Sequence, residues 1–150
     1  ATLKCFTKII HKFCQAESDN KKLREFIKPL TQLYKEWGDM TTQIGFKAMR
    51  NRDEVGAASV DYLMYSGYVA LAYFWTRAAL TAQKAIKNGA QDNAFYKAKI
   101  HTARFYFERI LPRTRMHLAA IESGSDNLMA LDEKDFILFD NRFTINSCWS

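Results

Sequence analysis

Apolar residues recur along most of this chain at spacings of three and four, which is the period of an amphipathic helix. The first such run covers about residues 2–15 and places these apolar side chains on one face: Leu3, Phe6, Ile10 and Phe13. Ser18, Asp19 and Asn20 follow it. Because their short polar side chains can accept hydrogen bonds from free amides, we predict a turn here and the N-cap of a second helix.

The second amphipathic run has a long apolar face made of Leu23, Phe26, Ile27, Leu30, Leu33, Tyr34, Trp37, Ile44 and Ala48. Pro29 lies within this pattern. Since proline has no amide proton to donate, it either kinks the helix near its start or marks its true first turn. The pattern fades over residues 50–52. We expect Asp53 and Glu54 to cap a third helix, whose N-terminal end favours acidic groups.

The third run, Val55–Thr76, reads VGAASVDYLMYSGYVALAYFWT, and Asp61 is its only charged residue. A helix that is apolar all round lies either in a membrane or inside protein. Its length satisfies both, since a membrane span needs roughly 20 apolar residues. However, tyrosines recur through its middle, whereas membrane aromatics prefer the two interfaces, and Asp61 would be costly in lipid. We therefore predict no membrane span but a central helix, enclosed by protein on every side, that stops at Gly89.

A fourth helix is predicted to start after Asp92 and Asn93, to be kinked by Pro112 and to end at Gly124. Its buried seam steps by four and three: Tyr96, Ile100, Ala103, Phe107, Ile110, Thr114, His117 and Ile121. Four helices joined by short turns predict an all-α fold, an antiparallel four-helix bundle with a short C-terminal tail. A chain of 150 residues is expected to be one domain, residues 1–150.

The tail after Gly124 carries a weaker pattern. Leu128, Met129 and Leu131 are apolar enough to fold back onto the bundle, and residues 132–135 have the composition of a turn. Residues 136–143 are compatible with an extended segment, and residues 140–150 form a tail without a firm assignment.

The formal charge of +6 comes from 22 basic and 16 acidic residues, and two groups of basic side chains contribute to it. One group lies near the N-terminus, and the other includes Arg104, Arg109, Arg113 and Arg115. Both could bind phosphates, but they lie opposite the apolar stripes, where a solvated helix face would place them. We therefore expect no nucleic-acid partner.

Cys5, Cys14 and Cys148 form an odd set without a CxxC pair. Cys5 and Cys14 are expected on one helix, too far apart for a disulfide. This pattern is typical of reduced, mostly buried thiols in a cytoplasmic protein. Lysines interrupt the N-terminal apolar stretch, so we expect no cleavable signal sequence.

The chain shows no pattern for catalysis or metal binding. No glutamate has a histidine three residues later, as the di-iron bundle motif requires, and His11, His101 and His117 lack ligand neighbours. Neither a nucleophile elbow nor a glycine-rich phosphate loop occurs. We therefore predict no catalytic, cofactor-binding or metal-binding residues. His117 is expected to be a satisfied core histidine, and Asp61 to pair with a neighbouring helix, an arginine of the fourth helix being a candidate partner.

Phe105, Tyr106 and Phe107 are consecutive on the fourth helix, between Arg104 and Arg109. They could stack on bases or on a flavin adenine, but on a helix they point in three directions, which disfavours a flat stacking platform. Phe107 is expected in the core, and Phe105 or Tyr106 at an interface with something outside the bundle.

Two segments resemble a bacterial acyl-CoA dehydrogenase subgroup, in the helical domain that follows its flavin-binding body. The first is DEVGAASVDYL at residues 53–63, running into GYVALAY at residues 67–73. The second includes Lys97–Lys99 and ARFYFERILP at residues 103–112, of which the FYFER-x-LP string is the most specific part. Ser123 and Gly124, followed by residues 128–131, are similar too. The resemblance covers roughly residues 23–136.

This resemblance implies an accessory C-terminal domain of an enzyme that oxidises acyl-CoA thioesters to enoyl-CoA. In that family a glutamate removes the α-proton while FAD takes a hydride from the β-carbon. Those groups belong to the preceding domains, so no catalytic or FAD-binding residue is carried over to this chain. The implied partners are the upstream dehydrogenase domains or a neighbouring subunit of a homo-oligomer. We thus expect one domain of a longer polypeptide, inactive alone; the alternative is a free-standing helical protein-interaction module.

Overall fold

A computed structural model of the chain describes residues 2–136. Its elements, in order, are the helices α1 (Thr2–Ala16), α2 (Arg24–Arg50), α3 (Asp53–Lys87) and α4 (Asn93–Phe105), the π-helix η1 (Tyr106–Ile110), the 3₁₀ helix η2 (Leu111–Arg113), α5 (Thr114–Ser123) and the 3₁₀ helix η3 (Glu133–Phe136). Over the described residues every regular element is helical, which confirms the predicted all-α class.

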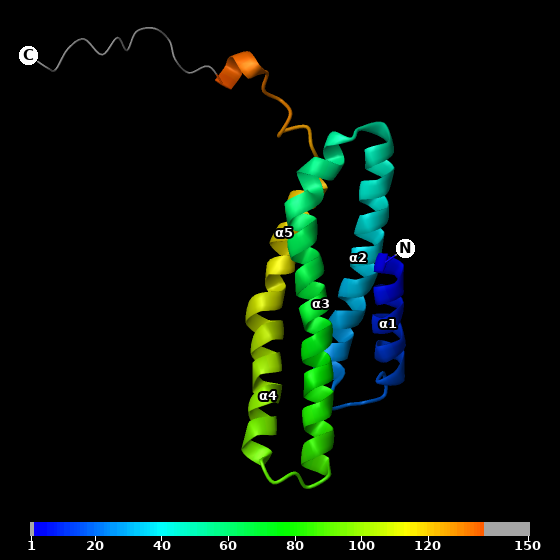
Figure 1. Ribbon diagram of the computed structural model, residues 1–150, viewed down its shortest axis with the longest axis vertical. Helices are drawn as coiled ribbons and strands as arrows, with labels where there is room; N and C mark the ends of the chain where they lie inside the picture. The colour runs from blue at the N-terminus through cyan, green and yellow to red at the C-terminus, as the bar shows by residue number, and fades with distance from the viewer. Residues whose placement is uncertain (1, 137–150) are drawn as a thin grey trace, which may run out of the picture.

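The helices run up and down beside one another, as Figure 1 shows. The segments α4, η1, η2 and α5 follow one another as a single interrupted rod. The long helix α3 lies between this rod and α2 and contacts both, while α1 packs against α2. The fold is therefore the predicted antiparallel four-helix bundle, in which α3 packs against α2 and against the interrupted rod.

The core lies where α1, α2, α3 and the interrupted rod meet. Its fully buried side chains come from several helices, namely Ile10, Leu23, Phe26, Leu30, Tyr65 and Val69. Burying an aliphatic or aromatic side chain of this size stabilises the fold by about 1.5–3 kcal/mol. Phe6 and Phe13 of α1 meet the ring of Tyr73 edge to face, at centroid distances of 5.7 and 5.5 Å, so the short first helix is held by aromatic contacts as well as by aliphatic ones.

The prediction for the start of α2 is partly wrong. A turn does follow α1, but the residue before α2 is Leu23, and no side chain caps the helix. Asn20 instead turns back, and its amide nitrogen donates to a carboxylate oxygen of Glu17 at 2.9 Å. Pro29 lies inside α2, so the alternative that it marks the first turn is wrong.

The boundary between α2 and α3 is where the sequence pattern placed it. Asp53 and Glu54 lie in the first turn of α3, as expected from the helix dipole. The side chain that accepts from a free amide is a different one, however. Asn51 Oδ1 accepts from the backbone nitrogen of Asp53 at 3.0 Å, so neither predicted acid caps the helix.

The helix α3 is not enclosed on every side, which corrects the prediction for the apolar run. Tyr65, Val69, Ala72 and Thr76 are buried, but one face lies open to solvent. Its exposed apolar side chains, with their exposed fractions, are Val55 51%, Val60 70%, Leu63 71%, Met64 43%, Leu71 49% and Phe74 54%. Neighbouring helices cover only part of the circumference of α3. Apolar residues also occur on the part that they leave uncovered, so the core of the described residues does not account for all of them. Over residues 2–136, no helix has the combined length and apolarity that crossing a bilayer requires.

The predicted fourth helix begins and ends as expected. Asp92 Oδ1 accepts from the backbone nitrogen of Phe95 at 2.9 Å, and Gly124 closes α5 with a positive φ of 74°. All eight predicted seam positions are buried or half-buried. The predicted interruption at Pro112 is present as a change from α-helix through the π-helix η1 to the 3₁₀ helix η2.

The tail does not pack as one alternative suggested. Leu128, Met129 and Leu131 are 66%, 62% and 58% exposed, so they do not fold back onto the bundle. The turn at residues 132–135 is confirmed: the backbone nitrogen of Asp135 donates to the carbonyl oxygen of Asp132 at 2.9 Å. The extended segment considered for residues 136–143 lies outside the described residues beyond Phe136, as do residues 140–150.

Candidate functional site

Asp61, the one charge in the apolar run, pairs with His117 of α5. Its Oδ1 lies 2.7 Å from His117 Nδ1, and the imidazole packs beside the ring of Tyr68 at a centroid distance of 5.6 Å. The prediction of a pair with a neighbouring helix is confirmed, and so is the satisfied core histidine, since His117 is 7% exposed. The candidate arginine partner is wrong, because Arg104 and Arg115 bind glutamates of α2 instead.

A second polar cluster joins α2, α3 and α5. The hydroxyl of the buried Tyr65 donates to Glu36 Oε1, and Arg115 Nη2 donates to the same oxygen at 2.5 Å. Burial and the adjacent Glu36 carboxylate both raise the pKa of the Tyr65 phenol. Tyr65 therefore stays protonated as a donor and cannot act as a general base. Sequence reasoning missed this cluster because its three residues come from three separate helices.

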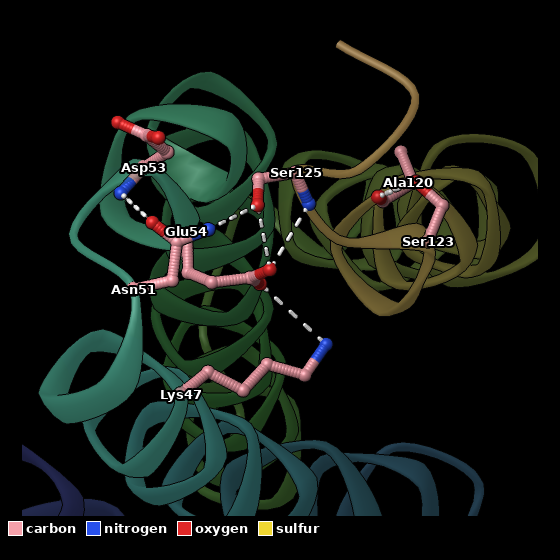
Figure 2. A network of polar contacts seen from close by, with 7 residues as sticks. All are labelled: Lys47, Asn51, Asp53, Glu54, Ala120, Ser123 and Ser125. Atoms are coloured by element: carbon pink, nitrogen blue, oxygen red, sulfur yellow. Dashed lines mark hydrogen bonds and ion pairs between the residues drawn. The ribbon is translucent and has the colours of Figure 1, made fainter. Parts of the chain in front are cut away.

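A third cluster, shown in Figure 2, joins the start of α3 to the segment after α5. Glu54 Oε1 accepts from both the backbone nitrogen and the hydroxyl of Ser125, at 3.1 and 2.8 Å. Asn51 donates to the same hydroxyl at 3.1 Å, and Lys47 Nζ lies 3.6 Å from Glu54 Oε2. The hydrogen bonds from Ser125, helped by Lys47, lower the pKa of Glu54. This carboxylate is thus a stabilised anion that ties two chain segments together.

The placement of the three consecutive aromatics agrees with the prediction, and Phe105 rather than Tyr106 is the exposed residue. Phe107 contacts the core, where its ring meets Phe26 edge to face at 5.1 Å, and Phe105 is 57% exposed. Tyr106 is buried and donates its hydroxyl to the carbonyl oxygen of Tyr68 at 2.9 Å. Only Phe105 is therefore free to contact something outside the bundle.

The thiols show no sign of a reactive site in the described part of the chain. Cys5 and Cys14 lie on α1 as expected, and neither forms a disulfide. Cys5 is exposed, whereas burial raises the pKa of the Cys14 thiol despite a hydrogen bond with Thr31. Among residues 2–136, no three histidine, cysteine or acidic side chains gather as metal ligands would. The prediction of no catalytic, cofactor or metal residue stays a prediction, and Cys148 lies outside the described residues.

Two recesses differ sharply in chemistry. The first, of about 590 Å³, lies between α2, α3 and α4; Lys21, Lys22, Lys87 and Arg104 line it together with Glu25. The second, which we call the apolar groove, has a volume of about 920 Å³ and is lined by residues of α1, α2 and α3. No lining residue of the apolar groove carries a charge. The clusters described above hold helices together, whereas the apolar groove lies open at the surface.

Comparison with known proteins places the fold in a family. The family described as "Acetyl-CoA dehydrogenase C-terminal like" matches residues 6–132, which is most of the chain. The chain belongs to this family. The match starts at Phe6 rather than near residue 23, so α1 is part of the family domain and not an addition to it.

One relative of this acetyl-CoA dehydrogenase C-terminal-like domain is the broad-specificity linear acyl-CoA dehydrogenase FadE5 of Mycobacterium tuberculosis. The two are 32% identical over 85 residues, which is 55% of this chain and 14% of the relative. The matched segment is thus a small part of that dehydrogenase. The family and the relative both agree with the resemblance inferred from the two sequence segments.

Proposed function

We propose that this chain is the C-terminal accessory domain of an FAD-dependent acyl-CoA dehydrogenase of the cytoplasm. The whole enzyme would oxidise acyl-CoA to enoyl-CoA in the catabolism of fatty acids or related acyl groups. The domain itself contributes packing, oligomer contacts or the shape of the substrate entrance, and no catalytic residue. The observation that carries this proposal is the family match over residues 6–132 of a bundle whose polar groups serve to join its helices.

Neither the apolar groove nor the basic recess fits the flavin. The apolar groove offers no cation for the pyrophosphate of FAD, since all its lining residues are uncharged. The basic recess has cations, but it lacks an aromatic wall for the flavin ring, and Arg104 already binds both carboxylate oxygens of Glu25. In this proposal FAD therefore belongs to other domains of the enzyme.

The ionic contacts support an architectural role. Glu25 and Glu36 of α2 bind Arg104 of α4 and Arg115 of α5, so α2 is tied to the interrupted rod at two points. Because these pairs are partly exposed, each contributes little free energy of unfolding, about 0–1 kcal/mol. Their effect is to hold the register between helices that the apolar core already packs together.

Two measurements test the proposal. The polypeptide that the gene encodes should carry FAD and oxidise acyl-CoA with an artificial electron acceptor, whereas the purified 150-residue chain should show neither flavin absorbance nor turnover. Stoichiometric flavin on the short chain would contradict an accessory role. A gene product that consists of this domain alone, and lacks flavin, would favour the free-standing interaction module instead.

A further inference from the structure

The apolar groove is a contiguous surface of mostly apolar, uncharged residues. Leu3 and Phe6 of α1, Trp37 and Ile44 of α2, and Val55 and Leu63 of α3 line it. Surfaces of this kind, when they are contiguous and uncharged, mark sites of interaction with another apolar surface. The groove is therefore distinct from the polar clusters, whose groups are already paired.

The hydroxyl groups of the groove are occupied by internal hydrogen bonds, whereas the buried Trp37 Nε1 has no partner among the described residues. Thr41 donates to the carbonyl oxygen of Trp37 at 2.6 Å and lies 2.8 Å from the hydroxyl of Tyr62. Ser66 and Ser59 donate to backbone carbonyls of their own helix, at 2.6 and 2.8 Å. With its hydroxyls used in this way, the groove has little to offer a phosphate, a sugar or a peptide backbone. What it presents is hydrocarbon.

The groove continues onto the exposed side of α3, which we call the outer face. Val60, Leu63, Gly67, Leu71 and Phe74 follow one another at spacings of three and four, so they form a single stripe along the helix. From Val60 to Phe74 this stripe runs about 21 Å, at about 1.5 Å per residue. Asp61, the one charge in the segment, is turned away toward His117. A stripe of that length matches the apolar face of another helix.

The position of α1 indicates where such a helix would come from. In Figure 1 the N-terminal end of α1 lies partway along α2, and both α2 and α3 continue beyond it. Leu3 and Phe6, in the first turns of α1, line the groove itself. Any polypeptide joined to the N-terminal end of α1 therefore enters beside the groove. In the matched relative, 86% of the polypeptide lies outside the matched segment, since that segment is 14% of its length.

We propose that the apolar groove, with the adjoining outer-face residues Val60 and Leu63, binds the dehydrogenase body of the same polypeptide through an amphipathic helix that precedes α1. That helix occupies the place beside α2 and α3 which α1 is too short to fill. The inference rests on the proposed function, because it requires the body to exist. It adds which surface of the domain the body contacts and the apolar chemistry of that contact.

Site-specific photocrosslinking tests this docking in the polypeptide that the gene encodes. Benzoylphenylalanine is placed at Leu63, in the groove, and in a second variant at Val60, on the outer face. The matched control carries it at Phe95 of α4, which is 49% exposed and does not line the groove. Equal amounts of ¹⁴N- and ¹⁵N-labelled protein are mixed before irradiation, so that peptides joined between two copies are recognised by mass. Circular dichroism confirms that each variant is folded.

We expect positions 60 and 63 to crosslink, within one polypeptide, to residues that precede Thr2, and position 95 to give no such product. Crosslinks from residue 60 or 63 that join ¹⁴N to ¹⁵N peptides would overturn the proposal in favour of contact between copies. Folded variants without a crosslink to the preceding residues would overturn it as well. Acyl-CoA oxidation is assayed on the unmodified preparation. If that activity is absent, the proposed function fails, whatever the crosslinks show.

Discussion

At the scale of single residues, polar side chains of one helix bind polar side chains of another. Asp61 and His117 show this clearly, since each is the other's polar partner across the contact of α3 with α5. The sequence pattern indicated that both needed a partner, because one stands alone in an apolar run and the other lies on a predicted seam. It did not pair them, because which face of α3 meets which turn of α5 depends on the packing of the helices.

Replacing Asp61 with alanine should leave the buried imidazole of His117 without its partner. We expect the Asp61→Ala variant to lose about 1–2 kcal/mol of the free energy of unfolding, the lower part of the cost of an unsatisfied buried polar group. The moderate value reflects an Asp61 side chain that is 31% exposed. Urea denaturation measures the loss. Asp126→Ala, at an exposed position, is the control and should change stability by less than about 0.5 kcal/mol.

Gly124 should not tolerate alanine. Its φ of 74° and ψ of −165° lie in a region that is essentially restricted to glycine, and an added Cβ would lie 3.2 Å from Glu54 Oε1. We expect Gly124→Ala to destabilise the fold by about 1–3 kcal/mol. The matched variant Gly38→Ala, inside α2 with nothing within 4 Å of its added Cβ, should instead stabilise by about 0.5–1 kcal/mol. Thermal unfolding of both variants would show opposite signs; two losses of similar size would contradict this account.

Glu54 should make stability depend on acidic pH. The hydrogen bonds from Ser125 lower its pKa below the ordinary value of 4.5, so the folded state binds this proton less readily than the unfolded state does. The stabilisation is therefore complete above the ordinary pKa and is lost as pH falls through the lowered one. Glu54→Gln keeps the shape and removes the titration. The difference in stability between wild type and variant, followed by denaturation from about pH 7 to about pH 3, should shrink; a constant difference would refute this role.

At the scale of elements, the ends of helices followed local chemistry, with exceptions where a nearby group took over. Asp92 caps α4 as predicted, whereas Asn20 bonds back to Glu17 and leaves α2 uncapped. The interruption around Pro112 also has a local cause, since proline cannot donate the bond that would continue the helix. The local sequence did not predict the form of the interruption, a π-helical step in which the backbone nitrogen of Leu111 donates to the carbonyl oxygen of Tyr106.

The cap of α4 can be tested directly. Asp92→Ala should leave the amide of Phe95 without its hydrogen-bond acceptor and lower the free energy of unfolding by about 1 kcal/mol. Asp92→Ser should restore most of it, because serine is a comparable N-cap. Amide hydrogen exchange at the start of α4, together with urea denaturation, measures both changes. If alanine and serine behave alike, the capping bond does not contribute.

At the scale of the whole molecule, the important feature is the apolar surface that the described helices leave exposed, in the apolar groove and on the outer face of α3. The isolated 150-residue chain should bind the dye 8-anilinonaphthalene-1-sulfonate in the apolar groove and enhance its fluorescence. Leu63→Glu should reduce that enhancement, since it places a charge in the groove at a site that is 71% exposed and structurally tolerant. Phe95→Glu, in the first turn of α4 and outside the groove, should not reduce it. Equal fluorescence in both variants would show that the dye binds elsewhere.

The sequence by itself determined the helical class, the approximate helix boundaries, the seam of the fourth helix and the family resemblance. These depend on local period, caps and motif residues, all of which are written in neighbouring positions. Only the tertiary structure decided which charges pair, because residues such as Glu36 and Arg115 meet through folding alone. It also decided which faces of the segment Val55–Thr76 are buried and which are exposed. Composition indicates that a segment avoids water but not which neighbour covers each face, and here the described helices leave one face of α3 exposed.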